Sequence, residues 1–219
     1  MGESAYQVTD RRPIKARELV FFQKLAAKLA AKGASANAIS VAGAVCAIVA
    51  GAALAMTRFT PLPWARGLWL LGAAGAQLRL QANLLDGMVA IAGGKASAVG
   101  ELYNEVPDRI SDPAIFIGLG YAAMASPWLG WLAALLAVLT AYVRVLGKSV
   151  GTGSDFRGPM GKQHRMFVVT VPCVLLALLP ATWLRWQPVN VALAVICVGS
   201  AWTAWRRLAG VAKKLKGNP

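Results

Sequence analysis

The chain of 219 residues carries 23 Lys and Arg against 9 Asp and Glu, a formal net charge of +14, yet 57% of it is hydrophobic. So high an apolar fraction excludes a disordered chain. Long apolar runs also argue against a soluble basic domain that binds nucleic acid, so no nucleic-acid partner is expected. The composition instead predicts a protein whose main solvent is lipid.

The first predicted element is an amphipathic helix within residues 14–32, where apolar side chains at helical spacing alternate with Lys and Arg. Such a helix is typical of a membrane surface, and the alternative is a core helix of a soluble cap. Six apolar stretches long enough to cross a bilayer follow, with Pro and Gly between them. They are Ala36–Phe59, Trp64–Ala92, Gly100–Ala125, Leu129–Leu146, Met166–Ala181 and Val189–Leu208.

These elements predict an all-α integral membrane fold with six transmembrane helices and an N-terminal interfacial amphipathic helix. Residues 1–33 are the cytoplasmic tail and interfacial helix, 34–208 the membrane domain, and 209–219 a basic cytoplasmic tail. Seventeen of the 23 Lys and Arg fall on the side of the N-terminus, and six of the eight Trp fall at the opposite ends of the spans. Both patterns predict cytoplasmic termini in a bacterial-type inner or cell membrane.

Five of the nine acidic residues fall within a stretch of 27 residues, in or beside predicted spans. A carboxylate at membrane depth is costly, so such residues indicate a functional site. On helices, Asn83 and Asp86 share one arc, and Asn104, Glu105, Asp108 and Asp112 share another. Oxygen ligands of this kind suit Mg²⁺ or Mn²⁺, and such an ion can then bind the phosphates of a substrate. The alternative is a structural network in which the acids pair with Arg79, Arg109 and Arg144.

The spacing of these residues resembles the signature of the CDP-alcohol phosphatidyltransferases, D-x2-D-G-x2-A-R-x8-12-G-x3-D-x3-D. The chain reads Asn83-Leu-Leu-Asp86-Gly87-Met-Val-Ala90-Ile91, then Gly100-Glu-Leu-Tyr-Asn104-Glu-Val-Pro-Asp108. Five of the eight fixed residues are identical and every spacing is kept. Asn83 and Asn104 stand where the family has Asp, and Ile91 stands where it has Arg.

Other segments are similar to the same family. Ser35-Ala-Asn37-Ala-Ile-Ser40 looks like its T-P-N-x-[IV]-[ST] segment, and Ser97 stands where relatives often use a hydroxyl against CDP. Arg144 and the run Gly161-Lys162-Gln-His-Arg165 are similar to the family's Arg and G-K-x-K-T segment. The resemblance covers most of residues 14–208.

The resemblance implies a transferase of phospholipid biosynthesis that moves a phosphatidyl-type group from a CDP-alcohol, such as CDP-diacylglycerol, to an acceptor alcohol and releases CMP. It implies Mg²⁺ or Mn²⁺ as cofactor, with an active site at the cytoplasmic face. Asp108 would be the general base, and the metal ligands would be Asn83, Asp86, Asn104 and Asp108. The residues that would bind CDP are Ser35, Asn37, Gly87, Ala90, Ser97 and Gly100. Those that would bind the acceptor or a phosphate are Arg144, Lys162 and Arg165.

Asn83 and Asn104 make the metal site less negative than the family signature does, because Asn ligates through a neutral carbonyl oxygen. Glu105 and Asp112 would restore the missing charge, or the site holds a second ion only with the diphosphate, or it is inactive. We favour the first two together. Lys95 would replace the cation lost at Ile91.

Two functions from other classes stay open. One is a non-catalytic membrane protein that binds nucleotide or lipid, and the other is a small transporter with an acidic ion path. Small residues at four-residue spacing, Gly43, Ala47 and Gly51, are weak support for a homodimer.

Overall fold

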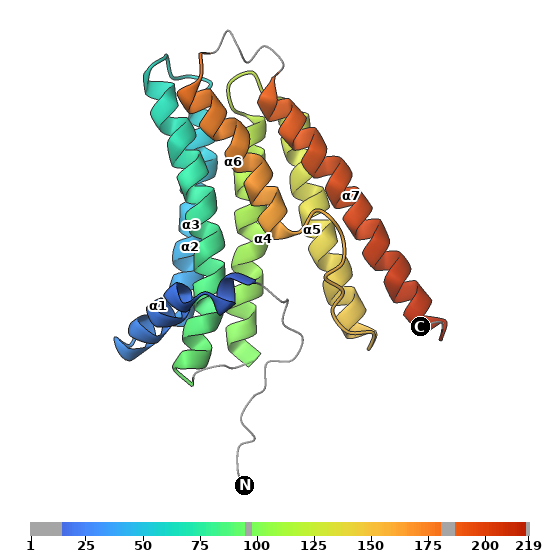
Figure 1. Cartoon of the computed structure of the whole chain (residues 1–219). Helices are drawn as coiled ribbons and strands as arrows, with labels where there is room; N and C mark the ends of the chain where they lie inside the picture. The colour runs from blue at the N-terminus through green and yellow to red at the C-terminus, as the bar shows by residue number, and fades with distance from the viewer. Residues whose placement is uncertain (1–14, 95–97, 181–186, 218–219) are drawn as a thin grey trace.

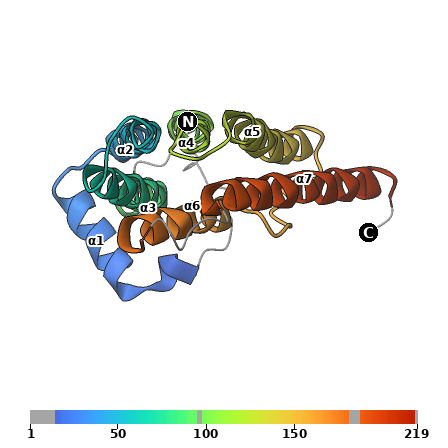
Figure 2. The same ribbon diagram turned by 90° about the horizontal axis from the view of Figure 1, so that it is seen from above.

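The computed structural model describes residues 15–94, 98–180 and 187–217, and this part of the chain contains helices and no strands. Six long helices stand in two rows of three, α2, α4 and α5 in one and α3, α6 and α7 in the other (Figure 2). Successive long helices run in opposite directions, and the shorter α1 lies across one end beside α3 (Figure 1). The bounds are α1 Val20–Ala31, α2 Ala36–Met56, α3 Trp64–Ala92, α4 Ala98–Gly120, α5 Pro127–Ser149, α6 Lys162–Leu178 and α7 Pro188–Leu215, with a 3₁₀ turn Lys15–Glu18 before α1.

Each of the six predicted apolar stretches overlaps one of the long helices over most of its length, so their helical nature is confirmed. Within the described residues, α2, α5 and α7 are long and apolar enough to cross a membrane by length and composition. These three helices support a membrane location. The remaining three long helices, α3, α4 and α6, carry the charged residues described below.

Local sequence explains where several helices begin. Ser35 accepts a hydrogen bond from the backbone N–H of Ala38, 3.4 Å away, which caps the start of α2. Pro127 and Pro188 occupy the first turns of α5 and α7. Proline is favoured there because its missing N–H would have no partner within the helix.

The core lies between the two rows of helices and is apolar. Its largest fully buried apolar side chains come from α2, α4, α6 and α7, and they are Leu54, Ile115, Phe116, Leu119, Met166, Leu193 and Ile196. Trp69 also lies in this core, with only 3% of its surface exposed. Trp69 is one of the six Trp predicted at the ends of the spans opposite the N-terminus; its side chain faces the interior of the bundle, so a position at the membrane interface is wrong for this residue.

Close helix contacts depend on glycine. A Cβ on Gly51 of α2 would collide with the backbone of Ala114 on α4, and a Cβ on Gly118 of α4 would collide with the backbone of Gly51. A Cβ on Gly43 would lie 2.7 Å from the side-chain Cβ of Ala82 on α3, which is also too close. The stripe of Gly43, Ala47 and Gly51 is thus buried within the chain, and the predicted homodimer stays a prediction without that support.

The amphipathic helix α1 packs on α3 through the buried Ala26. Its other faces are open, with Val20 and Phe21 more than half exposed. Lys24 and Lys28 are exposed as well. This pattern fits the predicted interfacial helix, whose contact with a membrane stays a prediction.

Candidate active site

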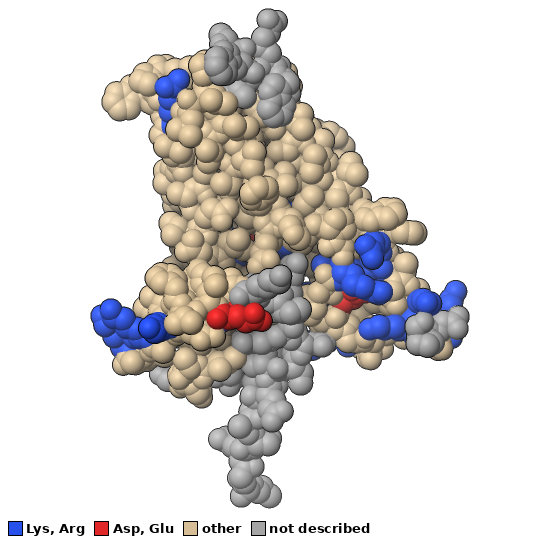
Figure 3. Space-filling model, in the orientation of Figure 1, with Lys and Arg blue, Asp and Glu red and all other residues tan. Residues whose placement is uncertain are grey.

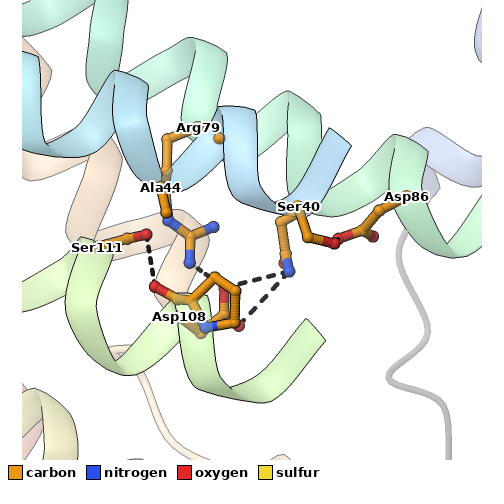
Figure 4. A pocket seen from close by; sticks show the side chains of 9 residues that line it. Ser40, Ala44, Arg79, Asp86, Asp108 and Ser111 are labelled. Carbon is orange, nitrogen blue, oxygen red and sulfur yellow. Dashed lines mark hydrogen bonds and ion pairs between the residues drawn. The ribbon is translucent and has the colours of Figure 1, made fainter. Parts of the chain in front are cut away.

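A small pocket opens between α2, α3 and α4, toward the end of the bundle at which α1 lies (Figures 1 and 4). It lies near the start of α2 and near the end of α3, because Ser40 and Asp86 both border it. Its lining residues are Ser40, Gly43, Ala44, Arg79, Asn83, Asp86, Pro107, Asp108 and Ser111.

Asp86 of α3 is buried and held by two donors. The Ser40 hydroxyl donates to Oδ2 at 2.6 Å, and the backbone N–H of Gly87 donates to Oδ1 at 2.5 Å. Ser40 was not predicted as a site residue. The sequence could have indicated Ser40, because it is the last residue of the Ser35–Ser40 segment that carried part of the resemblance.

Asp108 of α4 is surrounded by donors from two other helices. Arg79 of α3 pairs with its Oδ1, and Lys162 at the start of α6 pairs with its Oδ2. The Asn83 side-chain amide donates to both oxygens, at 3.2 and 3.5 Å, and its carbonyl accepts from Lys162 at 3.2 Å. The structure therefore brings together the predicted residues Asn83, Asp108 and Lys162, and it places Asp86 in the same pocket.

Asp112, one turn further along α4, forms a second buried pair. Arg165 donates to its Oδ2 at 2.7 Å, and Arg79 lies 3.7 Å from its Oδ1. Arg165 also donates to the Thr140 hydroxyl at 3.1 Å and to the carbonyl of Met160 at 3.2 Å. Because only 5% of Arg165 is exposed, its predicted contact with a phosphate would require this pairing to change, and that contact stays a prediction.

Glu105 lies in a separate, half-buried cluster. Arg144 of α5 donates to it at 2.5 Å, and Arg109 pairs with it from the next turn of α4. The guanidinium of Arg144 also lies 5.8 Å from the centre of the Phe156 ring. The pairings with Arg79, Arg109 and Arg144 that the structural alternative expected are therefore present in the molecule.

The predicted CDP-binding residues are less clustered than Asn83, Asp86 and Asp108, which line one pocket. Ser35 is exposed at the cap of α2, while Asn37, Gly87, Ala90 and Gly100 are half-buried. Lys95 and Ser97 lie outside the described residues, as does the side chain of Asn104. The roles of these eight residues stay predictions.

The oxygen donors fit a hard divalent cation at Asp86. This carboxylate is buried, and among the described side chains no Lys or Arg forms an ion pair with it. A buried unpaired carboxylate favours a cation beside it. No group of three His, Cys, Asp or Glu within the described residues could hold a metal alone. An ion there would therefore take further oxygens from Asn83, water or a bound substrate, as Mg²⁺ commonly does.

No family model matches this chain. Two curated proteins are similar to it over most of their length. The chain is 26% identical to the inner membrane protein YnbA of Escherichia coli over 177 residues, 81% of this chain and 84% of that protein. It is 25% identical to the phosphatidylinositol phosphate synthase of Mycobacteroides abscessus over 197 residues, 85% of this chain and 81% of that protein.

Solved structures share the fold. The phosphatidylinositol phosphate synthase of Mycobacterium tuberculosis in complex with manganese and citrate superposes with a TM-score of 0.70 at 20% identity, covering 87% of this chain and 88% of that chain. The same enzyme with CDP-DAG bound also gives 0.70 at 20% identity, covering 88% and 94%. The helical architecture of this chain is therefore the fold of these solved structures.

Proposed function

We propose that this chain is a CDP-alcohol phosphatidyltransferase of phospholipid biosynthesis. It would transfer a phosphatidyl-type group from a CDP-alcohol such as CDP-diacylglycerol to an acceptor alcohol and release CMP, with Mg²⁺ or Mn²⁺ as cofactor. One observation carries the proposal: Asp86 and Asp108, the two acids kept from the family signature, come from different helices and border one pocket. Two solved structures of a phosphatidylinositol phosphate synthase, with which this fold agrees, were determined with manganese and with CDP-DAG.

Different residues of the chain have different roles in this reaction. Ser40 and the N–H of Gly87 fix the carboxylate of Asp86, and Asn83 borders the same pocket with its carbonyl oxygen accepting from Lys162. A divalent cation bound there would neutralise the diphosphate and stabilise the departing CMP. Asp108 takes the proton of the acceptor hydroxyl, so that the oxygen can attack the phosphorus.

Lys162 must move for that proton transfer to occur. In this structure Arg79 and Lys162 each pair with one oxygen of Asp108, and Asn83 donates to both. Lys162 is the more accessible of the two cations, with 17% of its side chain exposed against 2% for Arg79. We therefore assign Lys162 the displaceable position, from which its ammonium can turn to a phosphate of the substrate.

We also propose that all six long helices span the membrane, with the pocket and both termini on the cytoplasmic side. Most Lys and Arg side chains visible in Figure 3 lie toward the end at which α1 and the last residues of α7 are found. Cytoplasmic segments of membrane proteins carry such an excess of positive charge.

The test is the release of CMP by the purified chain from labelled CDP-diacylglycerol, with a panel of acceptor alcohols and with or without Mn²⁺. Asp108→Asn should reduce turnover by about 10²-fold or more, because the amide cannot accept the proton. Asp155→Asn is the matched control, since Asp155 pairs with Arg157 in the loop before α6 and should leave turnover within a few-fold. CMP release that Asp108→Asn leaves unchanged would contradict the assignment of the base. No release with any alcohol would favour the non-catalytic alternative.

A further inference from the structure

Among the residues that the structure describes, the buried charges in and beside the pocket balance without any bound ion. Three carboxylates, Asp86, Asp108 and Asp112, lie with three cations, Arg79, Lys162 and Arg165, and all but Lys162 are buried. Each additional charge placed in this region must therefore be matched by another, because buried charge without a partner is strongly unfavourable.

Arg79 is a fixed member of this set. It lies on α3 four residues before Asn83, and only 2% of it is exposed. Its guanidinium pairs with Oδ1 of Asp108 and lies 3.7 Å from Oδ1 of Asp112, an oxygen with no hydrogen bond of its own. One guanidinium thus serves two carboxylates on consecutive turns of α4, and it cannot leave without exposing both.

We propose that Arg79 replaces the positive charge of a second metal ion, so that the site binds one divalent cation per chain when a CDP-alcohol is bound. This inference rests on the proposed function and specifies its metal requirement. The diphosphate of a CDP-alcohol carries one negative charge on each phosphate, which one divalent cation neutralises. A second ion would leave two uncompensated positive charges beside Arg79, and the charge of a bound ion dominates such a site.

Asp86 is the acid that holds the single ion. Its carboxylate faces Ser40 and the Gly87 N–H, both neutral donors, whereas Asp108 and Asp112 each face a guanidinium. Asn83 acts in the same direction as Arg79, because a neutral amide where the family signature has a carboxylate also makes the site more positive by one charge. The charge of Arg79 and the negative charge that Asn83 lacks together equal the charge of one divalent ion.

The test counts ions directly. Free Mn²⁺ is measured by electron paramagnetic resonance during titration of the full-length chain in nanodiscs, with saturating CDP-diacylglycerol. We expect one Mn²⁺ per chain, and we expect two for the double variant Arg79→Gln with Asn83→Asp, which makes the site more negative by two charges. Arg109→Gln removes the same charge from the half-exposed pair with Glu105, outside the pocket, and should keep the count at one.

Two Mn²⁺ per wild-type chain, or none, would overturn the inference whether or not the double variant folds. A folded double variant that still binds one would overturn it as well. CMP release is scored separately. One bound ion without CMP release would contradict the proposed function but not the metal count. Two bound ions with CMP release would contradict only the metal count.

Discussion

Arg165 and Asp112 face each other with 6% of each side chain exposed, at 2.7 Å. Substituting Arg165 by Met would leave the carboxylate of Asp112 buried with only the more distant Arg79 beside it. Loss of one partner of a buried ion pair costs about 3–5 kcal/mol of folding free energy. We expect Arg165→Met to lower the free energy of unfolding by that amount, measured by denaturant titration in detergent micelles.

Arg109→Met is the matched control, because the Arg109–Glu105 pair is 30% and 38% exposed. Pairs of this kind contribute about 1 kcal/mol or less. Equal losses of stability in the two variants would contradict the structural importance of the Asp112 pair.

At the residue scale, the sequence pattern groups Asn83, Asp86 and Asp108, which border one pocket, but it does not predict the partners of the acids. The helical arcs of Asn83 with Asp86, and of Asp108 with its neighbours, follow from the helical repeat alone. Lys162 reaches Asp108 across 54 positions of the chain, and Arg165 reaches Asp112 across 53. Those contacts depend on how the start of α6 is placed beside α4, which hydropathy does not encode.

The contact between α2 and α4 at Gly51 and Gly118 leaves no room for a methyl group. Gly51→Ala should separate the two helices or strain them, at a cost of about 1–3 kcal/mol for an overpacked contact. The measurement is the midpoint of thermal unfolding in detergent. Gly67→Ala in α3 is the control, because a Cβ there meets nothing within 4 Å. A stability for Gly51→Ala equal to that of Gly67→Ala would argue against this packing.

The ends of the helices were predicted less well than their centres. α6 begins at Lys162, before the apolar stretch predicted from Met166, and α7 continues to Leu215, beyond the predicted Leu208. Hydropathy reports the lipid-facing part of a span, whereas backbone hydrogen bonds continue the helix through polar residues into the interface. The polar first turn of α6 is also where Lys162 and Arg165 meet the acids.

At the scale of the whole molecule, the proposed orientation predicts which loops face the outside. In a variant whose three cysteines, Cys46, Cys173 and Cys197, are replaced by Ser, a single cysteine is introduced at Phe59 or at Gly217. Phe59 is 75% exposed between α2 and α3, and Gly217 follows α7. A membrane-impermeant thiol reagent on intact cells should label Phe59→Cys directly and Gly217→Cys only after permeabilisation. The reverse pattern would invert the proposed topology.

The distribution of the buried charges has a consequence for how the chain is made. α3 brings Arg79 and Asp86, α4 brings Asp108 and Asp112, and α6 brings Lys162 and Arg165, so each of these helices is charged when taken alone. The helices α2, α5 and α7 are long and apolar enough to span a membrane by themselves; α2 precedes the consecutive pair α3 and α4, and α5 separates that pair from α6. Entering lipid singly, α3, α4 and α6 would each expose charge to hydrocarbon. With all six long helices spanning the membrane, as proposed, we expect α3 and α4 to be retained beside the translocation machinery during synthesis until α6 emerges and neutralises the set.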